Sequence, residues 1–145
     1  MKRLLYLMLL ATVGLTSCEL ETSDNGDLDG QWQMYQLDTL ATNGITDMRD
    51  STIFWAVQMN LLELKHPKGN LLKNIVCHFE RKGDSLIVNH PRYNDRMESN
   101  PEVVDVAVLN KYGISNLREA FFVYRLNSNR MDLQSDCFRL HFRKY

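Results

Sequence analysis

The segment DLDGQWQMYQL, residues 27–37, marks the point where the folded part of the chain is expected to begin. Gly30, Gln31 and Trp32 stand at the start of the run QWQMYQL (31–37), which is rich in aromatic and aliphatic residues. Such a run after a glycine is typical of a β-strand. We therefore predict the first strand of the domain here.

The chain beyond this strand reads as mostly β. Further runs of β-branched, aromatic and aliphatic residues occupy 51–65, 71–81, 85–90, 119–126, 130–135 and 137–145. Turn sequences separate several of them, at residues 67–70, 82–84 and 127–129. Because the links are short, we expect antiparallel neighbours joined as a meander.

The segment 100–113 supports two interpretations. Asn100 before Pro101 resembles a helix N-cap followed by the first helical position, and Gly113 fits a C-terminal cap. The valines at 103, 104, 106 and 108 favour a strand instead. We favour a short helix near 101–112; a strand there would raise the strand count from seven to eight.

Seven or eight sequential antiparallel strands in one small chain predict an all-β, up-and-down barrel. Closure of the sheet removes the exposed edges that invite aggregation. The interior of an eight-stranded barrel is either filled by side chains or holds one small ligand.

The Gly30-Gln31-Trp32 motif resembles the G-x-W signature of lipocalins and related calycin barrels. In that family the tryptophan plugs the closed end of the barrel and an arginine from the end of the chain often lies across it. The resemblance implies such a role for Arg139 or Arg143. Because the last predicted strand runs to residue 145, we do not expect the C-terminal helix of larger lipocalins. The interval from Asp38 to Asp50 is too short for the helical lid of fatty-acid-binding proteins. Lipid or retinoid binding is therefore not carried over.

Strand alternation predicts which residues face the barrel interior. One expected inward face carries Phe138, Leu140 and Phe142, opposite an outer face with Arg139, His141 and Arg143. Two more inward faces are expected at residues 55, 57, 59 and 61 and at residues 122, 124 and 126. If a pocket exists, its polar-tipped lining candidates are Tyr35, Trp55, His78 and Tyr124. The alternative is that these faces fill a packed barrel.

The N-terminus resembles a bacterial lipoprotein signal over residues 1–17. Lys2 and Arg3 precede an apolar run at 4–13, which is too short to span a bilayer. Leu15-Thr16-Ser17-Cys18 is similar to a lipobox, in which cleavage precedes the cysteine and its thiol carries lipid. Two or more acyl chains give stable anchoring. We expect Cys18 to hold the protein on the outer membrane of the cell envelope; an ordinary secretory signal is the alternative.

The residues after Cys18 are acidic and nearly devoid of apolar side chains. Residues 18–29 are expected to form a flexible tether, since such a stretch buries too little surface to offset its ordering entropy. The acidic run also resembles the surface-export signal of lipoproteins from anaerobic Gram-negative gut bacteria, although a plain linker explains it equally well. The face of the membrane, periplasmic or external, stays open. The barrel domain is assigned to residues 30–145.

The composition gives no sign of nucleic-acid binding. The chain has 17 basic and 18 acidic residues, and loss of Lys2 and Arg3 with the signal leaves 15 basic ones. This balance lacks the basic footprint that nucleic acids require.

Catalytic and metal-binding motifs are not found in the sequence. Adjacent Cys77 and His78 point to opposite faces of a strand, and Cys137 and His141 lie about 13 Å apart at ~3.3 Å per residue. One zinc ion joins neither pair. A disulfide between Cys77 and Cys137 is disfavoured because the two strands are not neighbours in a meander. No cofactor is expected.

Three functions remain open. The first is a lipid-anchored barrel that binds a small apolar or amphipathic ligand without chemistry, in an internal cavity lined by Trp55 and Tyr124. The second is a protein-interaction module, an inhibitor or an accessory subunit of a surface complex, with a filled barrel and an exposed patch near the loop 89–101. An enzyme is the third and ranks last.

Overall fold

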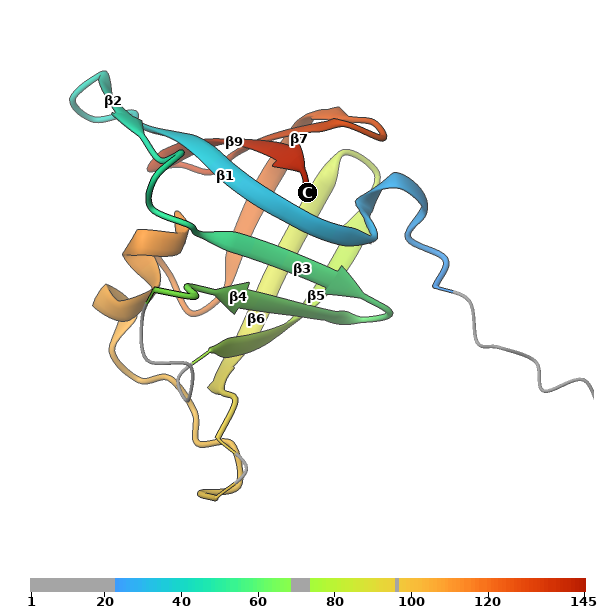
Figure 1. Ribbon diagram of the computed structural model, residues 1–145, viewed down its shortest axis with the longest axis vertical. Coiled ribbons are helices and arrows are strands. Elements are labelled where there is room, and N and C mark those ends of the chain that lie inside the picture. The colour runs from blue at the N-terminus through green and yellow to red at the C-terminus, as the bar shows by residue number, and fades with distance from the viewer. Residues whose placement is uncertain (1–22, 69–73, 96) are drawn as a thin grey trace, which may run out of the picture.

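The computed structural model describes residues 23–68, 74–95 and 97–145, which form one antiparallel sheet closed into a barrel (Figure 1). The predicted signal peptide, Cys18, the start of the 71–81 run and Arg96 lie outside the described residues. The strands of the described part are β1 (Gly30–Thr39), β2 (Gly44–Asp47), β3 (Phe54–Gln58), β4 (Leu61–Lys65), β5 (Ile75–Lys82), β6 (Ser85–Tyr93), β7 (Glu119–Leu126), β8 (Arg130–Gln134) and β9 (Phe138–Lys144).

Pairing of β1 with β9 closes the barrel. Successive strands from β3 to β9 are neighbours, and β1 pairs with β3 on one side and β9 on the other. The eight-stranded barrel confirms the predicted fold class, and β2 is an additional strand. It pairs with the second half of β1 and projects from the barrel (Figure 1).

A hydrogen-bonded histidine reinforces this closure on the outer surface. The Nδ1 atom of His141 on β9 lies 2.9 Å from Asp132 of β8, and Nε2 lies 3.0 Å from Asp38 of β1. The three side chains are 15–20 % exposed. One ring thereby bridges the two strands that flank β9.

Large apolar side chains fill the barrel. Trp32, Met34, Trp55, Met131 and Phe142 are all fully buried. Ring centroids of Trp55 lie 5.0 Å from Phe142 and 5.6 Å from the edge-on ring of Phe121, within the range of favourable aromatic pairs. Burial of each such side chain contributes about 1.5–3 kcal/mol. The interior is therefore a packed core, and the expected inward positions of Leu140 and Phe142 are confirmed.

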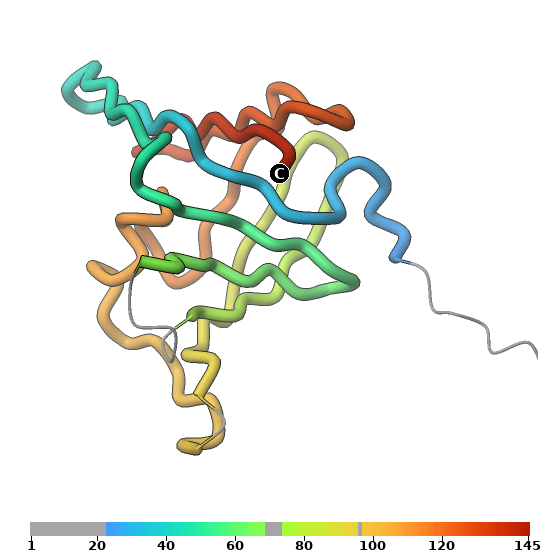
Figure 2. Tube along the Cα trace, in the orientation of Figure 1, coloured from blue at the N-terminus to red at the C-terminus, as the bar shows by residue number. Residues whose placement is uncertain are grey.

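The segment before β1 packs against one end of the barrel and is not part of a flexible tether. Leu28, in the short 3₁₀ helix η1 (Gly26–Leu28), is 2 % exposed, and its carbonyl accepts a bond of 2.8 Å from Nε1 of Trp32. The Asn25 side chain donates to the carbonyl of Met59, 2.6 Å away. Residues 25–29 thus belong to the folded unit, so its boundary precedes Gly30. Figure 2 shows this segment turning onto the end of the barrel.

Lys144, and neither Arg139 nor Arg143, lies across the tryptophan of the motif. The β1–β9 register sets Lys144 directly opposite Trp32, with Nζ 4.2 Å from the ring centroid. Lys144 also donates to the carbonyls of Asp27 and Asp29. The arginines are on the outer face, where they donate to Gln134 and Gln33 at 2.8 and 2.9 Å.

The run 51–65 forms two strands where one was predicted. Gln58 pairs with Leu61, so Met59 and Asn60 make a two-residue turn between β3 and β4. Met59 adopts a φ of 56°, at a position that glycine usually occupies in such hairpins. Met59 and Leu61 are exposed, which corrects their predicted inward placement. The sequence has no glycine at this turn that would have predicted it.

The expected short helix exists as the 3₁₀ helix η3 (Val106–Tyr112), which covers one end of the barrel. Gly113 caps it at a φ of 78°, as predicted. The N-cap is Asp105, whose carboxylate accepts from the Ala107 amide, and the predicted cap at Asn100 is wrong. Pro101 lies instead beside β6, its carbonyl accepting from the Tyr93 amide at 2.9 Å.

A bulge in β7 reverses the predicted inward face. Val123 pairs with Leu133 and Arg125 with Asp132, which leaves Tyr124 as an extra residue. Phe122 and Tyr124 are 47 % and 56 % exposed, whereas Phe121 is buried in the core. Simple alternation therefore assigned the wrong side, and only Leu126, after the bulge, packs against the core as predicted.

Both described cysteines are free thiols. Cys77 points into the core, where burial raises the pKa of its thiol to about 12. Cys137 is exposed. The absence of a disulfide between them agrees with the sequence-based expectation.

Gly113 provides a test of the packing between η3 and β9. A Cβ at Gly113 would overlap the Leu140 side chain, and its positive φ also disfavours any L side chain. We expect Gly113→Ala to lower the free energy of unfolding by about 2–4 kcal/mol in urea denaturation.

Gly83→Ala is the matched control. Gly83 has a φ of 59° but open space around the added Cβ. Gly83→Ala should lower the free energy of unfolding by only ~1–2 kcal/mol, the cost of the left-handed conformation for an L residue. Equal losses in the two variants would contradict the close packing at Gly113.

Candidate functional site

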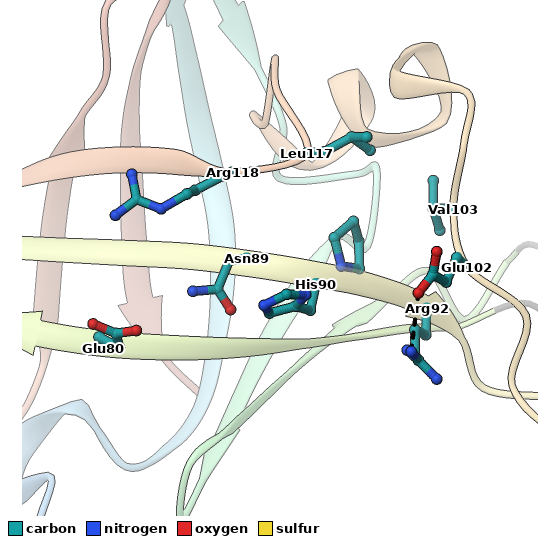
Figure 3. Close-up of a pocket in the computed structure, with 9 residues that line it drawn as sticks. Glu80, Asn89, His90, Arg92, Glu102, Val103, Leu117 and Arg118 are labelled. Carbon is teal, nitrogen blue, oxygen red and sulfur yellow. Dashed lines mark hydrogen bonds and ion pairs between the residues drawn. The ribbon is translucent and has the colours of Figure 1, made fainter.

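A groove of about 430 Å³ lies on the outer surface of the barrel, beside β6 (Figure 3). Its floor comes from the second half of β6, and its walls come from β5, the turn before β7 and the segment before η3. It is lined by Glu80, Asn89, His90, Pro91, Arg92, Glu102, Val103, Leu117 and Arg118.

The groove forms where β6 changes its partner. The first half of β6 pairs with β7 as far as Val88, which is opposite Glu119. Further along β6, the Val103 amide donates to the Pro91 carbonyl at 3.0 Å, so the segment before η3 replaces β7 as the partner of β6. Asn89 and His90 lie between these two pairings, and the barrel wall is hollowed there.

His90 holds a strained backbone conformation at this point. His90 and Pro91 together oppose the single residue Cys77, which is a β-bulge. The φ of His90 is 50°, and the first position of such a bulge is usually a glycine. A left-handed conformation costs an L residue about 1–2 kcal/mol. Bulges are frequent beside functional sites, where they redirect a side chain.

The floor of the groove carries an unsatisfied polar atom. Asn89 is 8 % exposed, and its Oδ1 has no hydrogen-bond partner among the described residues. Its amide nitrogen lies on the Glu80 side in Figure 3. Reversing the amide would turn its oxygen towards the carboxylate, so the orientation with the nitrogen towards Glu80 is favoured. A buried acceptor without a partner is uncommon and costs about 1–3 kcal/mol.

Glu80 is an ionised carboxylate on the β5 wall. The Lys82 ammonium, 3.0 Å away, holds the pKa of the Glu80 carboxyl below its ordinary value, with smaller contributions from Arg118 and the Asn89 amide. The groove thus presents a hydrogen-bond acceptor on this side at neutral pH.

The opposite wall is held in place by the buried carboxylate of Glu119. It accepts hydrogen bonds from the Ser115 amide, from the Ser115 hydroxyl at 2.8 Å and from the Asn116 amide at 3.0 Å. These bonds fix the turn that presents Leu117 and Arg118 to the groove. Arg118 makes no ion pair within 4.0 Å among the described residues, so its guanidinium is available as a donor.

The third side is closed by an exposed ion pair. Arg92 on β6 lies 3.0 Å from Glu102. Val103 beside it is 3 % exposed and contributes apolar surface. The groove therefore combines donors, acceptors and apolar contacts within one small volume.

The four ligand candidates from the sequence do not come together. Trp55 is in the packed core, where its Nε1 donates to the Tyr112 carbonyl at 3.2 Å. Tyr35 is a bulged residue of β1 on the outer surface, with Arg130 4.9 Å from its ring. Tyr124 is also outside, with Arg139 5.2 Å from its ring.

His78 is the one candidate beside the groove. It is exposed on β5, and its ring centroid lies 6.2 Å from that of His90. Sequence reasoning missed Asn89, Glu80 and Arg118 as parts of one site. The only available signal was the His90-Pro91 pair at the start of the long loop predicted for 89–101, since β6 in fact continues to Tyr93.

Within residues 23–68, 74–95 and 97–145, no three His, Cys, Asp or Glu side chains are placed to hold a metal ion. In the same ranges, no helix has the length and apolar character needed to cross a bilayer.

An eight-stranded up-and-down barrel with a buried G-x-W tryptophan defines the lipocalin-like class. The family described as lipocalin-like domain matches residues 13–145, so the chain belongs to this family.

Two solved structures from Bacteroides are similar in fold. A lipocalin-like protein from Bacteroides uniformis is 23 % identical with a TM-score of 0.62, over 83 % of this chain and 100 % of that chain. An uncharacterized protein from Bacteroides eggerthii is 18 % identical with a TM-score of 0.57, over 81 % of this chain and 98 % of that one. A comparison with curated proteins finds no match.

The strain at His90 can be measured by comparing two substitutions. His90→Gly and His90→Ala both remove the imidazole, but only glycine adopts the positive φ without strain. We expect His90→Gly to be more stable than His90→Ala by about 1 kcal/mol in urea denaturation. If the His90→Ala variant is as stable as the His90→Gly variant, the backbone at the groove is unstrained.

Proposed function

We propose that this protein is a non-catalytic, lipid-anchored binding protein of the cell envelope whose small amphipathic ligand occupies the outer groove beside β6. The observation that carries the proposal is the buried, unpartnered Oδ1 of Asn89 at the groove floor. A ligand donor that reaches this atom after a small side-chain movement would satisfy it and offset its desolvation cost.

The packed interior supports an external site. The predicted internal cavity lined by Trp55 and Tyr124 is wrong, because Trp55 is fully buried against Phe121 and Phe142 while Tyr124 is outside. A ligand of any size inside the described barrel would have to displace these side chains. Dense packing makes such displacement costly.

The composition of the groove supports an amphipathic ligand. Pro91, Val103 and Leu117 offer apolar contacts, and Asn89 and Glu80 offer acceptors. The volume of about 430 Å³ is within the usual range for small-molecule sites. The lipocalin-like family is generally non-catalytic, which agrees with a binding role.

Native mass spectrometry tests the ligand. The full chain, extracted in detergent from its own membranes, should carry a small-molecule adduct that organic extraction removes. Asn89→Leu should lose the adduct because it removes the groove acceptor. Asn110→Leu, at an exposed position on η3, is the control and should keep it. An adduct that survives Asn89→Leu, or a clean apo mass throughout, would contradict a ligand in the groove.

The anchor is tested separately by Cys18→Ala. Removal of the thiol that carries the lipid should move the protein from the membrane pellet to the supernatant on fractionation, with its unfolding midpoint unchanged. Cys137→Ala, which removes an exposed thiol of the barrel, should stay in the pellet. Retention of the Cys18→Ala chain in the membrane would overturn lipid anchoring.

A protein partner is the second candidate function. Met97 and Val104 are 94 % and 83 % exposed, within the loop that extends from β6 towards η3. Apolar side chains this exposed are typical of contact surfaces when they cluster. This candidate predicts that Met97→Glu weakens co-purification of a partner without changing any small-molecule adduct.

A further inference from the structure

We propose that the groove recognises a hydroxyl-rich, uncharged ligand, a short saccharide or related polyol. This inference rests on the proposed function and names the chemical class of its ligand. It derives from the unpaired Asn89 oxygen together with the mixed charges that surround it.

The charges of the walls disfavour ionic ligands. An anion would approach the Glu80 carboxylate and the unpaired amide oxygen, which both repel it. A cation would approach the unpaired guanidinium of Arg118. Because side chains of both charges line one small volume, the groove favours neither an anionic nor a cationic ligand.

A purely apolar ligand is disfavoured as well. Its contacts with Pro91 and Leu117 would be favourable, but it would leave Asn89 Oδ1 buried without a donor. Burying an acceptor permanently without a partner is unfavourable. The ligand must therefore donate at least one hydrogen bond to the groove floor.

Hydroxyl groups suit this arrangement best. A hydroxyl both donates and accepts, and it rotates to suit its partners. A polyol would donate to Asn89 and Glu80 on one side and accept from Arg118 on the other, while its C–H surface contacts Leu117 and Val103. A peptide amide has one donor and one acceptor in fixed opposite directions, so it matches fewer of these partners.

The rigidity of the walls supports selective recognition. Glu119 fixes the turn that presents Arg118, and the bulge at His90 fixes the floor. Donors and acceptors held in place before binding lose little freedom when the ligand arrives. His90 lies beside Asn89 in Figure 3 and is exposed, so its imidazole is a further contact for the ligand.

The test is a titration of the ¹⁵N-labelled full chain in detergent, followed by NMR chemical shifts. The probes are the methyl glycosides of glucose, galactose, mannose and N-acetylglucosamine. N-acetylalanine methylamide and inorganic phosphate are added in separate titrations to test a peptide amide and an anion as alternative ligands. At least one glycoside should shift the Asn89 side-chain amide and the Arg118 backbone amide saturably. The other two probes should not.

Variants show whether the shifts report on the groove. Asn89→Leu should weaken glycoside binding about tenfold, the effect of one hydrogen bond to a buried group. Arg118→Gln alters only an exposed side chain, so it folds normally, and it should weaken binding several-fold. Asn110→Leu should bind as the unaltered chain does.

The outcomes separate this inference from the proposed function. Saturable shifts with the amide or with phosphate in place of the glycosides, or glycoside binding unchanged in both groove variants, would overturn the saccharide assignment. The absence of saturable chemical-shift changes with every glycoside would overturn it as well. The endogenous adduct seen by native mass spectrometry, if sensitive to Asn89→Leu, would still support a ligand in the groove.

Discussion

The pairing of β1 with β9 is the constraint on which the rest of the structure depends. It joins residues more than a hundred positions apart, as the bond between Asp38 and His141 shows. The same register brings Lys144 over Trp32 and places Leu140 and Phe142 in the core. Closure leaves the eight barrel strands without a free edge, so the apolar faces of the strands all point to one interior.

A filled interior directs recognition to the outer surface. Trp32, Trp55 and Phe142 occupy the space that a ligand would need, while irregularities in three strands shape the outside. Bulges place Tyr35 and Tyr124 on the outer surface and turn the backbone at His90. In this lipocalin-like domain, regular strands build the core and departures from regularity build the candidate site.

The sequence predicted the fold better than the site, for physical reasons. Gly30 and Trp32 mark the first strand, and Gly113 marks the end of η3, because such local signals need no knowledge of distant partners. The turn at Met59 and the bulge at Tyr124 carry no glycine or proline, so alternation assigned the wrong faces around them. The groove depends on where β6 changes partner, which is a property of long-range pairing.

The position of the closing strand has a consequence for biosynthesis. β1 is the first strand to leave the ribosome. It cannot complete its pairing until β9 has been made, because Trp32 of β1 pairs with Lys144 of β9. Such non-local pairing slows folding, because the ends must meet before their contacts contribute. The barrel therefore stays open during synthesis until β9 has left the ribosome, and before then the apolar faces of the earlier strands have no closed interior to share.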